Sequence, residues 1–304
     1  MNRILCIETV LVLLVWVLAL RPPLATPHAM VTIPEGASLG EVGTILKHAH
    51  IIVSVNAYSL VARVLGGARF GTYVFNQPES VLAIAWRIAE GDTGAPLVKV
   101  TIPEGATSKE IGAILADSLP GFDETHFDQV ASKSEGYLFP ETYFFAAGTP
   151  INQILATMHA TFVTKTADIK AAATSTRSFA DIVTMASILE KEARKYETRQ
   201  TIAGILWKRI DAGMPLQVDA VFGYIAGTST FSPTFNQLKV DSPYNTYTHK
   251  GLPPGPIGNP GIDAIQAALH PTPSKYWFYL TGTDGTMHYA VTLNQHVANR
   301  KYLK

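Results

Sequence analysis

Two acidic residues stand close together near the end of one predicted helix. Residues 181–193 contain no Gly or Pro, and their apolar side chains recur every three or four positions, which is typical of an amphipathic helix. At about 100° per residue, Glu192 falls on the same stripe as Ile188 and Leu189. Glu190 falls well away from that stripe. The sequence therefore predicts that the helix turns the Glu192 carboxyl toward the interior.

The position of Glu192 has a chemical consequence, because the C-terminal end of a helix carries partial negative charge. That charge and burial both disfavour the ionised carboxylate, so both are expected to raise the pKa of Glu192. A general acid that works near neutral pH needs such a raised pKa. The alternative is an ordinary ion pair at the edge of a core, with Arg194, Lys195 or Arg199 as the partner. The helix alone leaves both interpretations open.

The composition of the chain restricts the class of protein. Its 304 residues suggest two domains, and 47% hydrophobic residues are enough for a sizeable core. The 24 Lys and Arg balance the 24 Asp and Glu, so no basic excess predicts nucleic-acid binding. The single cysteine, Cys6, excludes an intramolecular disulfide, and no group of Cys and His has zinc-site spacing. We therefore expect no metal and no other cofactor.

The N-terminus predicts a membrane segment. Residues 4–20 are almost wholly apolar, Arg3 precedes them, and Arg21-Pro22-Pro23 ends them. This length is at the short limit for a spanning helix, and a cleaved signal peptide is the alternative. We expect an anchor or signal within residues 1–24 and a single-pass protein of the cytoplasmic membrane, with the rest of the chain extracytoplasmic.

An internal repeat follows the N-terminus. Residues 31–46 and 100–115 both read as a short strand, a Pro-Glu-Gly turn and a helix. Each helix opens with a capping box, formed by Ser38 with Glu41 and by Thr107 with Glu110. Two copies are too few for a solenoid and predict two related small α+β units. Such units could bind a polymer or serve as a spacer, and the pattern does not separate these roles.

Further elements are predicted between and after the two copies. Between them the pattern predicts a helix at 57–65, a strand at 71–75 and a helix at 81–90. After them, residues 134–145 contain five aromatic residues and two acids. Such a stretch suits a sugar-binding cleft, although a core strand with polar ends has the same pattern.

The second half of the chain alternates helices with a long loop. A polar, Ala- and Thr-rich connection leads to the helix of Glu192, and a second helix is predicted at 199–212. The loop at 242–261 is rich in Pro and Gly and poor in charge, which favours a functional loop over a disordered one. A hairpin at 276–280 and 287–292, followed by a short helix, closes the chain.

These motifs together resemble the YceG-like family, the endolytic murein transglycosylases. The matching stretches occur in the family's order and extend from about Ser134 to the C-terminus. They are Glu135-Gly136, Phe139-Pro140-Glu141-Thr142, Ala186–Glu192, Gly213–Asp219, Tyr244-Asn245-Thr246-Tyr247, Gly251–Ile257 and Asn259-Pro260-Gly261. Several motifs in one order make a more specific signal than any one of them.

The resemblance also implies a fold. The expected class is α+β, with three regions along the chain. They are an N-terminal membrane helix or signal at 1–24, a LysM-like small α+β region with the internal repeat at 30–120, and an α+β catalytic domain at 130–304.

The resemblance implies a reaction and a catalytic residue. The family's catalytic glutamate is the second Glu of its Glu-Lys-Glu motif, which corresponds to Glu192. The reaction is cleavage of the β-1,4 bond between N-acetylmuramic acid and N-acetylglucosamine, with attack by the muramic 6-hydroxyl to leave a 1,6-anhydro end. One carboxyl can act as acid and then base, because the nucleophile is tethered in the substrate. On this basis Glu192→Gln abolishes cleavage and Glu190→Gln retains substantial activity.

Further residues are candidates for binding the substrate. Those that could hold sugar hydroxyls or N-acetyl groups, or orient Glu192, are Glu135, Gln217, Asp219, Tyr244, Asn245 and Thr246. For each of them a purely structural role is an equal alternative. The chain departs from the family at Val218, where Thr is common, and at Gly258-Asn259.

The expected function is termination of strand elongation by internal cleavage of nascent peptidoglycan. Its partners would be the glycan strands and the peptidoglycan polymerases. A catalytically silent peptidoglycan-binding protein is one alternative. A two-carboxylate hydrolase that uses Glu192 with Asp219 is another, and the chemistry of the new chain ends separates it from the transglycosylase.

Overall fold

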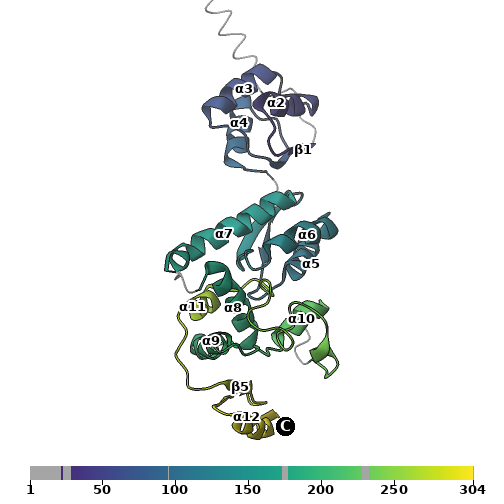
Figure 1. Cartoon of the computed structure of the whole chain (residues 1–304). Helices are drawn as coiled ribbons and strands as arrows, with labels where there is room; N and C mark the ends of the chain where they lie inside the picture. The colour runs from purple at the N-terminus through teal and green to yellow at the C-terminus, as the bar shows by residue number, and fades with distance from the viewer. Residues whose placement is uncertain (1–21, 23–28, 95, 173–176, 228–232, 304) are drawn as a thin grey trace, which may run out of the picture. The chain divides into compact units, whose positions relative to one another are not determined.

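The computed structural model describes residue 22 and residues 29–94, 96–172, 177–227 and 233–303. The chain divides into two compact units (Figure 1). Unit 1 comprises Met1–Lys99, Ser118–Phe122 and Phe144–Ile154, and unit 2 comprises Val100–Asp117, Asp123–Tyr143 and Leu155–Lys304. Helices and short two-stranded sheets occur together, so the predicted α+β class is confirmed.

Unit 1 is a small sheet with helices packed on it. Its elements are β1 (Ala29–Ile33), α2 (Leu39–His48), α3 (Val55–Val64), β2 (Gly71–Phe75) and α4 (Val81–Glu90). β1 runs antiparallel to β2, with Ala29 opposite Phe75 and Ile33 opposite Gly71. The predicted strand at 71–75 and helix at 81–90 are confirmed, as is the capping box of Ser38 and Glu41.

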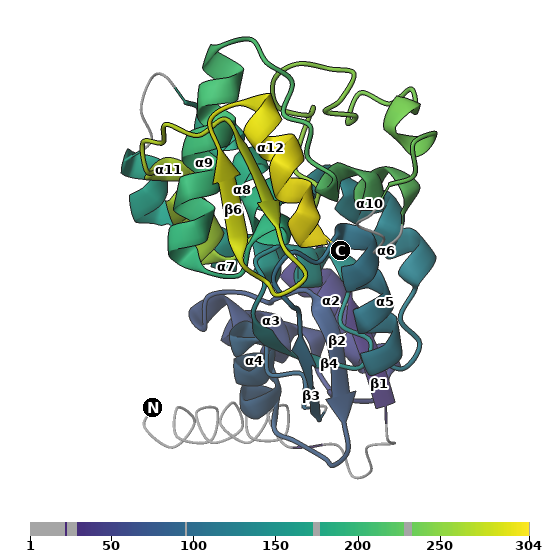
Figure 2. The same ribbon diagram turned by 90° about the horizontal axis from the view of Figure 1, so that it is seen from below.

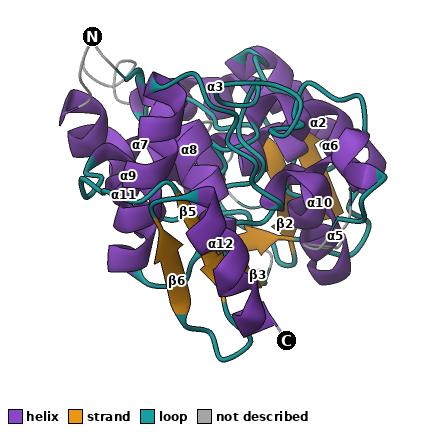
Figure 3. Cartoon of the chain, turned by 60° about the horizontal axis from the view of Figure 1, so that its bottom comes forward, coloured by secondary structure: helices purple, strands orange, loops and turns teal. Residues whose placement is uncertain are grey.

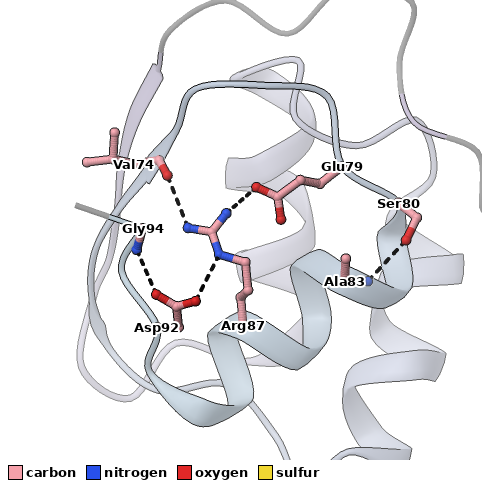
Figure 4. A network of polar contacts seen from close by, with 7 residues as sticks. All are labelled: Val74, Glu79, Ser80, Ala83, Arg87, Asp92 and Gly94. Carbon is pink, nitrogen blue, oxygen red and sulfur yellow. Dashed lines mark hydrogen bonds and ion pairs between the residues drawn. The ribbon is translucent and has the colours of Figure 1, made fainter. Parts of the chain in front are cut away.

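One arginine connects the end of β2 to α4 (Figure 4). Arg87 donates to the Glu79 carboxylate and to the Val74 carbonyl oxygen at 3.1 Å, and its Nε lies 3.7 Å from Asp92. Its guanidinium also lies over the Phe75 ring, 5.0 Å from the centroid. Two carboxylates and one carbonyl therefore surround this positive charge.

The middle of the chain carries the second copy of the repeat. Its elements are β3 (Leu97–Thr101), α5 (Ser108–Ser118), α6 (Glu124–Ala131), the 3-10 turn η1 (Ser132–Ser134), β4 (Thr142–Ala146) and α7 (Ile151–Ala172). β3 pairs with β4. Thr107 and Glu110 form the predicted capping box.

The prediction of a polar connection before the helix of Glu192 is wrong, because most of that stretch forms the helix α7. Met158, Phe162 and Ile169 are buried and recur at helical spacing, which supplies an apolar face. Several threonine hydroxyls on this helix, including that of Thr166, donate to the carbonyl four residues earlier. The high Thr and Ala content concealed this face in the sequence.

The rest of unit 2 is built around one buried helix. The elements are α8 (Phe179–Glu192), α9 (Tyr196–Asp211), α10 (Ala220–Ala226), η2 (Gln237–Lys239), α11 (Ile262–Leu269), β5 (Phe278–Thr281), β6 (Met287–Ala290), α12 (Leu293–Asn299) and η3 (Arg300–Leu303). Residues 182–189 of α8 are all buried, and α9 and α11 pack against it. β5 and β6 form an antiparallel hairpin with α12 beside it (Figures 2 and 3).

The prediction of a single-pass membrane protein is corrected. In the part of the chain that the structure describes, no helix is long and apolar enough to cross a membrane. The longest one, α7, carries Lys165, Asp168 and Lys170. Residues 4–20, where the anchor was expected, lie outside the described residues.

The division into compact units separates the two copies of the repeat. The second copy of the repeat, at Val100–Asp117, belongs to unit 2, whereas the first copy belongs to unit 1. The two copies are therefore parts of different compact units.

Candidate active site

Glu192 is the last residue of α8, at the point where the chain leaves the helix through the extended residue Ala193. Its Oε2 accepts a hydrogen bond from the Tyr279 hydroxyl at 2.9 Å. The carboxyl also accepts the backbone N–H of Ala220. Three elements, α8, β5 and the start of α10, therefore meet at this one carboxyl.

The surroundings of Glu192 shift the pKa of its carboxyl toward neutral pH. Burial raises its pKa to about 7, and the nearby Asp219 acts in the same direction. The Tyr279 hydroxyl, the Ala220 N–H and the Arg209 guanidinium oppose that rise in pKa. A carboxyl with this pKa is populated in both forms near neutral pH, so it can donate a proton and later accept one.

Among the described residues, Glu192 has no ion pair. Arg199, one of the three cations that were possible partners of Glu192, pairs with Glu190 instead. Arg199 donates to Glu190, and their side chains are only 6% and 5% exposed. Glu190 also accepts the Gly261 N–H at 3.0 Å. Burial raises the pKa of Glu190, and the Gly261 N–H and the Arg199 guanidinium oppose that rise.

This pairing corrects the prediction that Glu190 lies away from the interior. Two faces of α8 are covered, because the α9 helix and the loop before α11 bury the side that a single apolar stripe leaves free. Glu190 joins these segments, so its role is structural.

The buried side chain of Arg209 holds together two segments that flank Glu192. Arg209 on α9 donates through Nε to the Trp277 carbonyl at 2.8 Å and through Nη1 to the Leu216 carbonyl at 2.6 Å. Trp277 directly precedes β5, and Leu216 precedes the predicted site residues Gln217 and Asp219. One side chain thus fixes the strand of Tyr279 and the loop of Asp219 together.

Two of the predicted binding residues line the same hollow as Glu192. This hollow, of about 670 Å³, is called here the aromatic arm, and it is lined by Glu192, Gln217, Asp219, Tyr247, Phe278, Tyr279 and His296 among others. Asp219 is exposed and accepts the Tyr247 hydroxyl at 2.6 Å. Gln217 is exposed and has a positive φ of 51°, and its N–H donates to the Thr246 carbonyl at 3.1 Å.

Two other predicted binding residues hold the loops that form this arm. The buried Thr246 hydroxyl exchanges hydrogen bonds with the N–H and carbonyl of Val218, at 3.0 and 3.3 Å. The buried Asn245 amide donates to the carbonyls of Leu238 and Val240, and its oxygen accepts the Tyr247 N–H. Their polar atoms are engaged by the backbone.

Glu135 and Tyr244 lie outside the aromatic arm. Glu135 is 7% exposed and accepts the N–H and hydroxyl of Ser108, the latter at 2.8 Å, and the Asn259 amide at 3.0 Å. Burial raises its pKa. The Tyr244 ring packs on Tyr224 with 4.9 Å between centroids. Glu135 and Tyr224 line a separate hollow of about 320 Å³.

A second and larger hollow also reaches Glu192. It measures about 1090 Å³ and is called here the charged arm, lined by Glu104, Lys191, Glu192, Arg194, Lys195 and Asp284 among others. The two arms share Lys191, Glu192 and Thr281. The acid therefore stands where an open groove continues in two directions, as an extended polymer would need.

A comparison with known protein families identifies the family of the chain. The model of the YceG-like family matches residues 31–302. The chain belongs to the YceG-like family. This confirms the family that the sequence motifs indicated.

Individual YceG-like relatives cover most of the chain. It is 31% identical over 307 residues to the endolytic murein transglycosylase of Bacillus subtilis (strain 168), covering 90% of this chain and 84% of that protein. It is 28% identical to the protein of the same name from Streptococcus pneumoniae strain D39, of which it spans 58%. A crystal structure of a yceG-like protein from Listeria monocytogenes superposes with a TM-score of 0.62 at 29% identity, covering 90% of this chain and 99% of that one.

Sequence reasoning missed three residues of this candidate site. Tyr247 lies in the Tyr-Asn-Thr-Tyr motif, so its neighbours already pointed to it. Arg209 and Tyr279 lie in a predicted helix and a predicted strand that carry no motif. Tyr279 follows Glu192 by 87 residues, and no local spacing indicates that the two meet.

Proposed function

We propose that this protein is an endolytic murein transglycosylase that cleaves the β-1,4 bond between N-acetylmuramic acid and N-acetylglucosamine inside glycan strands. Membership of the YceG-like family and relatives of that name support the proposal. The observation that carries it is Glu192, an acid with a pKa raised to about 7 at the junction of two open arms.

Glu192 is proposed to act twice. The protonated carboxyl donates its proton to the glycosidic oxygen as the bond to muramic C1 breaks. The resulting carboxylate then accepts the proton of the muramic 6-hydroxyl, whose oxygen bonds to C1 and closes the 1,6-anhydro ring. Glu192 ends in its starting state, and no water is consumed. One carboxyl suffices because the attacking hydroxyl is already held in the same sugar.

Tyr279 is proposed to position the Glu192 carboxyl. Burial raises the pKa of Tyr279 well above its ordinary value, so its hydroxyl stays protonated and donates. This hydrogen bond favours the ionised form of Glu192 and opposes the effect of burial. Tyr279 therefore keeps the pKa of Glu192 within the range in which both steps can occur.

The remaining predicted residues divide into two proposed groups. Gln217 and Asp219 line the aromatic arm and are proposed to contact sugar hydroxyls, with Tyr247 holding Asp219. Glu135, Asn245, Thr246 and Tyr244 are proposed to hold the surrounding loops, because their contacts in the structure are with protein groups.

The family resemblance supports a wider role. We propose that cleavage ends the elongation of nascent strands, with peptidoglycan polymerases as partners, and that residues 30–120 form a LysM-like region before a catalytic region at 130–304. The elements β1, α2, α3 and β2 follow one another along the chain, and β1 pairs with β2. This arrangement supports a small α+β module within the first of these regions.

A hydrolase that uses two carboxylates is the second candidate, because Asp219 lines the same arm as Glu192 and influences its pKa. Mass spectrometry of purified strands digested by the protein separates the two reactions. Anhydromuramic ends support the transglycosylase, and reducing ends support the hydrolase.

The same digestion needs two variants beside the wild type. Glu192→Gln removes the acid, and Asp168→Asn removes an exposed acid of α7 that lines neither arm. Product from the wild type and from Asp168→Asn, but not from Glu192→Gln, supports the assignment. Binding of strands without cleavage by any of the three would favour the silent peptidoglycan-binding protein.

A further inference from the structure

The two arms that meet at Glu192 differ in chemistry. The aromatic arm presents rings of Tyr247, Phe278 and Tyr279, whose faces suit the apolar faces of sugar rings. The charged arm has no aromatic side chain among its described lining residues. Its lining is instead rich in ionised and hydroxyl groups, and its volume of about 1090 Å³ exceeds that of the aromatic arm. The charged arm therefore suits a charged group that the strand carries, in addition to the sugar rings themselves.

The acids of the charged arm are partly neutralised or held by protein groups. Glu190 is paired with Arg199. The Asp284 carboxylate accepts the N–H and the hydroxyl of Thr286, each at 2.9 Å, and these bonds lower its pKa. The hairpin tip thus keeps Asp284 ionised and in a fixed place.

Two cations of the charged arm are available to a ligand. Arg194 and Lys195 are both exposed, and neither takes part in an ion pair within the described part of the chain. They follow Ala193, the residue after the end of α8, so they lie on the chain within three residues of Glu192. A ligand that carries carboxylates would meet these cations while its scissile bond is at Glu192.

We infer that the charged arm binds the peptide branch of a murein strand through the branch's carboxylates. This inference rests on the proposed function. Murein strands carry short peptides on the lactyl group of muramic acid, so a strand held at Glu192 places such a branch next to the scissile bond. Arg194 and Lys195 receive the carboxylates, and Glu104 and Asp284 face an amino group of the same branch. The site thereby selects peptide-bearing strands over bare glycan.

The test compares two substrates and two pairs of substitutions. The substrates are strands with intact peptide branches and the same strands stripped by an N-acetylmuramoyl-L-alanine amidase. The test variant is Arg194→Gln with Lys195→Gln. The control variant is Lys133→Gln with Lys170→Gln, which removes two exposed lysines of unit 2 that line neither arm. Both variants lose the same amount of charge.

The readout is the ratio of kcat/KM for peptide-bearing strands to kcat/KM for stripped strands. We expect the wild type and the control variant to share a ratio well above one. We expect the test variant to lower that ratio by roughly three- to tenfold, because exposed ion pairs are individually weak. Added salt should lower the wild-type ratio in the same direction.

Binding measured in the Glu192→Gln background separates this inference from the proposed reaction. A ratio that the Arg194 and Lys195 substitutions leave unchanged overturns the inference. So do equal losses on both substrates, because the cations would then serve the glycan itself. Preferential binding of peptide-bearing strands with no cleavage by the wild type overturns the proposed reaction and leaves the peptide site standing.

Discussion

Unit 1 and unit 2 each hold a partly buried ionisable side chain where a strand meets a helix, but the two side chains have different partners. In unit 1, Arg87 is surrounded by the carboxylates of Glu79 and Asp92 (Figure 4). In unit 2, Glu192 is bonded to a hydroxyl and a backbone N–H, which are neutral donors. A charge beside its counter-charge gains nothing by changing its protonation state. A buried acid with neutral donors has a pKa near 7.

Glu190 shows what a counter-charge adds to burial, because burial raises its pKa too and the Arg199 guanidinium opposes that rise. It lies two residues before Glu192 on the same helix and is also buried, yet it pairs with Arg199. It therefore belongs with Arg87 among the groups that hold the fold together. Proximity in sequence to Glu192 therefore does not give Glu190 the same environment.

The largest expected effect comes from removing the carboxyl of Glu192, the acid that has neutral donors as its hydrogen-bond partners. We expect Glu192→Gln to lower cleavage by about 10²- to 10⁴-fold or more, because both proton transfers depend on this carboxyl. The measurement is the rate of anhydromuramic product formation, with circular dichroism to confirm that the variant is folded. Retention of more than a tenth of the wild-type rate would contradict the role of Glu192.

Removing the paired acid should act on stability. Glu190→Gln leaves Arg199 buried without its counter-charge, which typically costs about 3–5 kcal/mol. Chemical denaturation measures this loss. The earlier expectation that Glu190→Gln retains substantial activity now holds only for the fraction that stays folded. A variant with wild-type stability would show that the pair contributes nothing.

The raised pKa of Glu192 predicts a pH-dependent cost in stability. Between the ordinary value of 4.5 and about 7, the folded state holds a proton that the unfolded state releases. Stability is therefore lost as pH rises through this window, by at most about 3 kcal/mol. Glu192→Gln lacks this titration, so its melting temperature should exceed that of the wild type at pH 8 more than at pH 5. An equal difference at both pH values would contradict the assigned pKa.

Breaking the paired charge of unit 1 should have a smaller and local effect. Arg87→Met leaves Glu79 and the Val74 carbonyl without their donor, at a cost of about 2 kcal/mol because both side chains of the pair are partly exposed. Hydrogen exchange should show the loss of protection in α4 and β2. Arg63→Met, which removes an exposed arginine of α3, serves as the control and should leave protection unchanged.

The smallest expected effect concerns the neutral donor itself. Tyr279→Phe removes the hydroxyl that favours ionised Glu192, so the pKa of Glu192 should rise further. We expect the limb of the pH–rate profile that reports Glu192 to move to higher pH, with kcat lowered by about tenfold through poorer positioning. Tyr276→Phe, in the segment just before β5, should keep the wild-type profile. An unmoved limb in Tyr279→Phe would show that the hydroxyl has no influence on the acid.

Local sequence was sufficient to predict much of the secondary structure. The two Pro-Glu-Gly turns have nearly the same backbone, with φ of 79° at Gly36 and 78° at Gly105, and both are followed by a capped helix. Turn chemistry and capping depend on residues a few positions apart, so they can be recognised without a fold. The periodicity of α8 likewise placed Glu192 on an interior face.

The environments of these same residues depend on parts of the chain that are far away in sequence. A side chain at Gly36 would meet no atom within 4 Å, whereas the Gly105 N–H donates to the Asn259 carbonyl at 2.8 Å. Likewise, Arg199 pairs with Glu190 and Tyr279 with Glu192, and nothing in the periodicity of α8 distinguishes the two acids' partners. Periodicity reports which face of a helix is covered but carries no information about which distant residue covers it. Only packing in three dimensions therefore determines which acid pairs with an arginine and which is left with neutral donors.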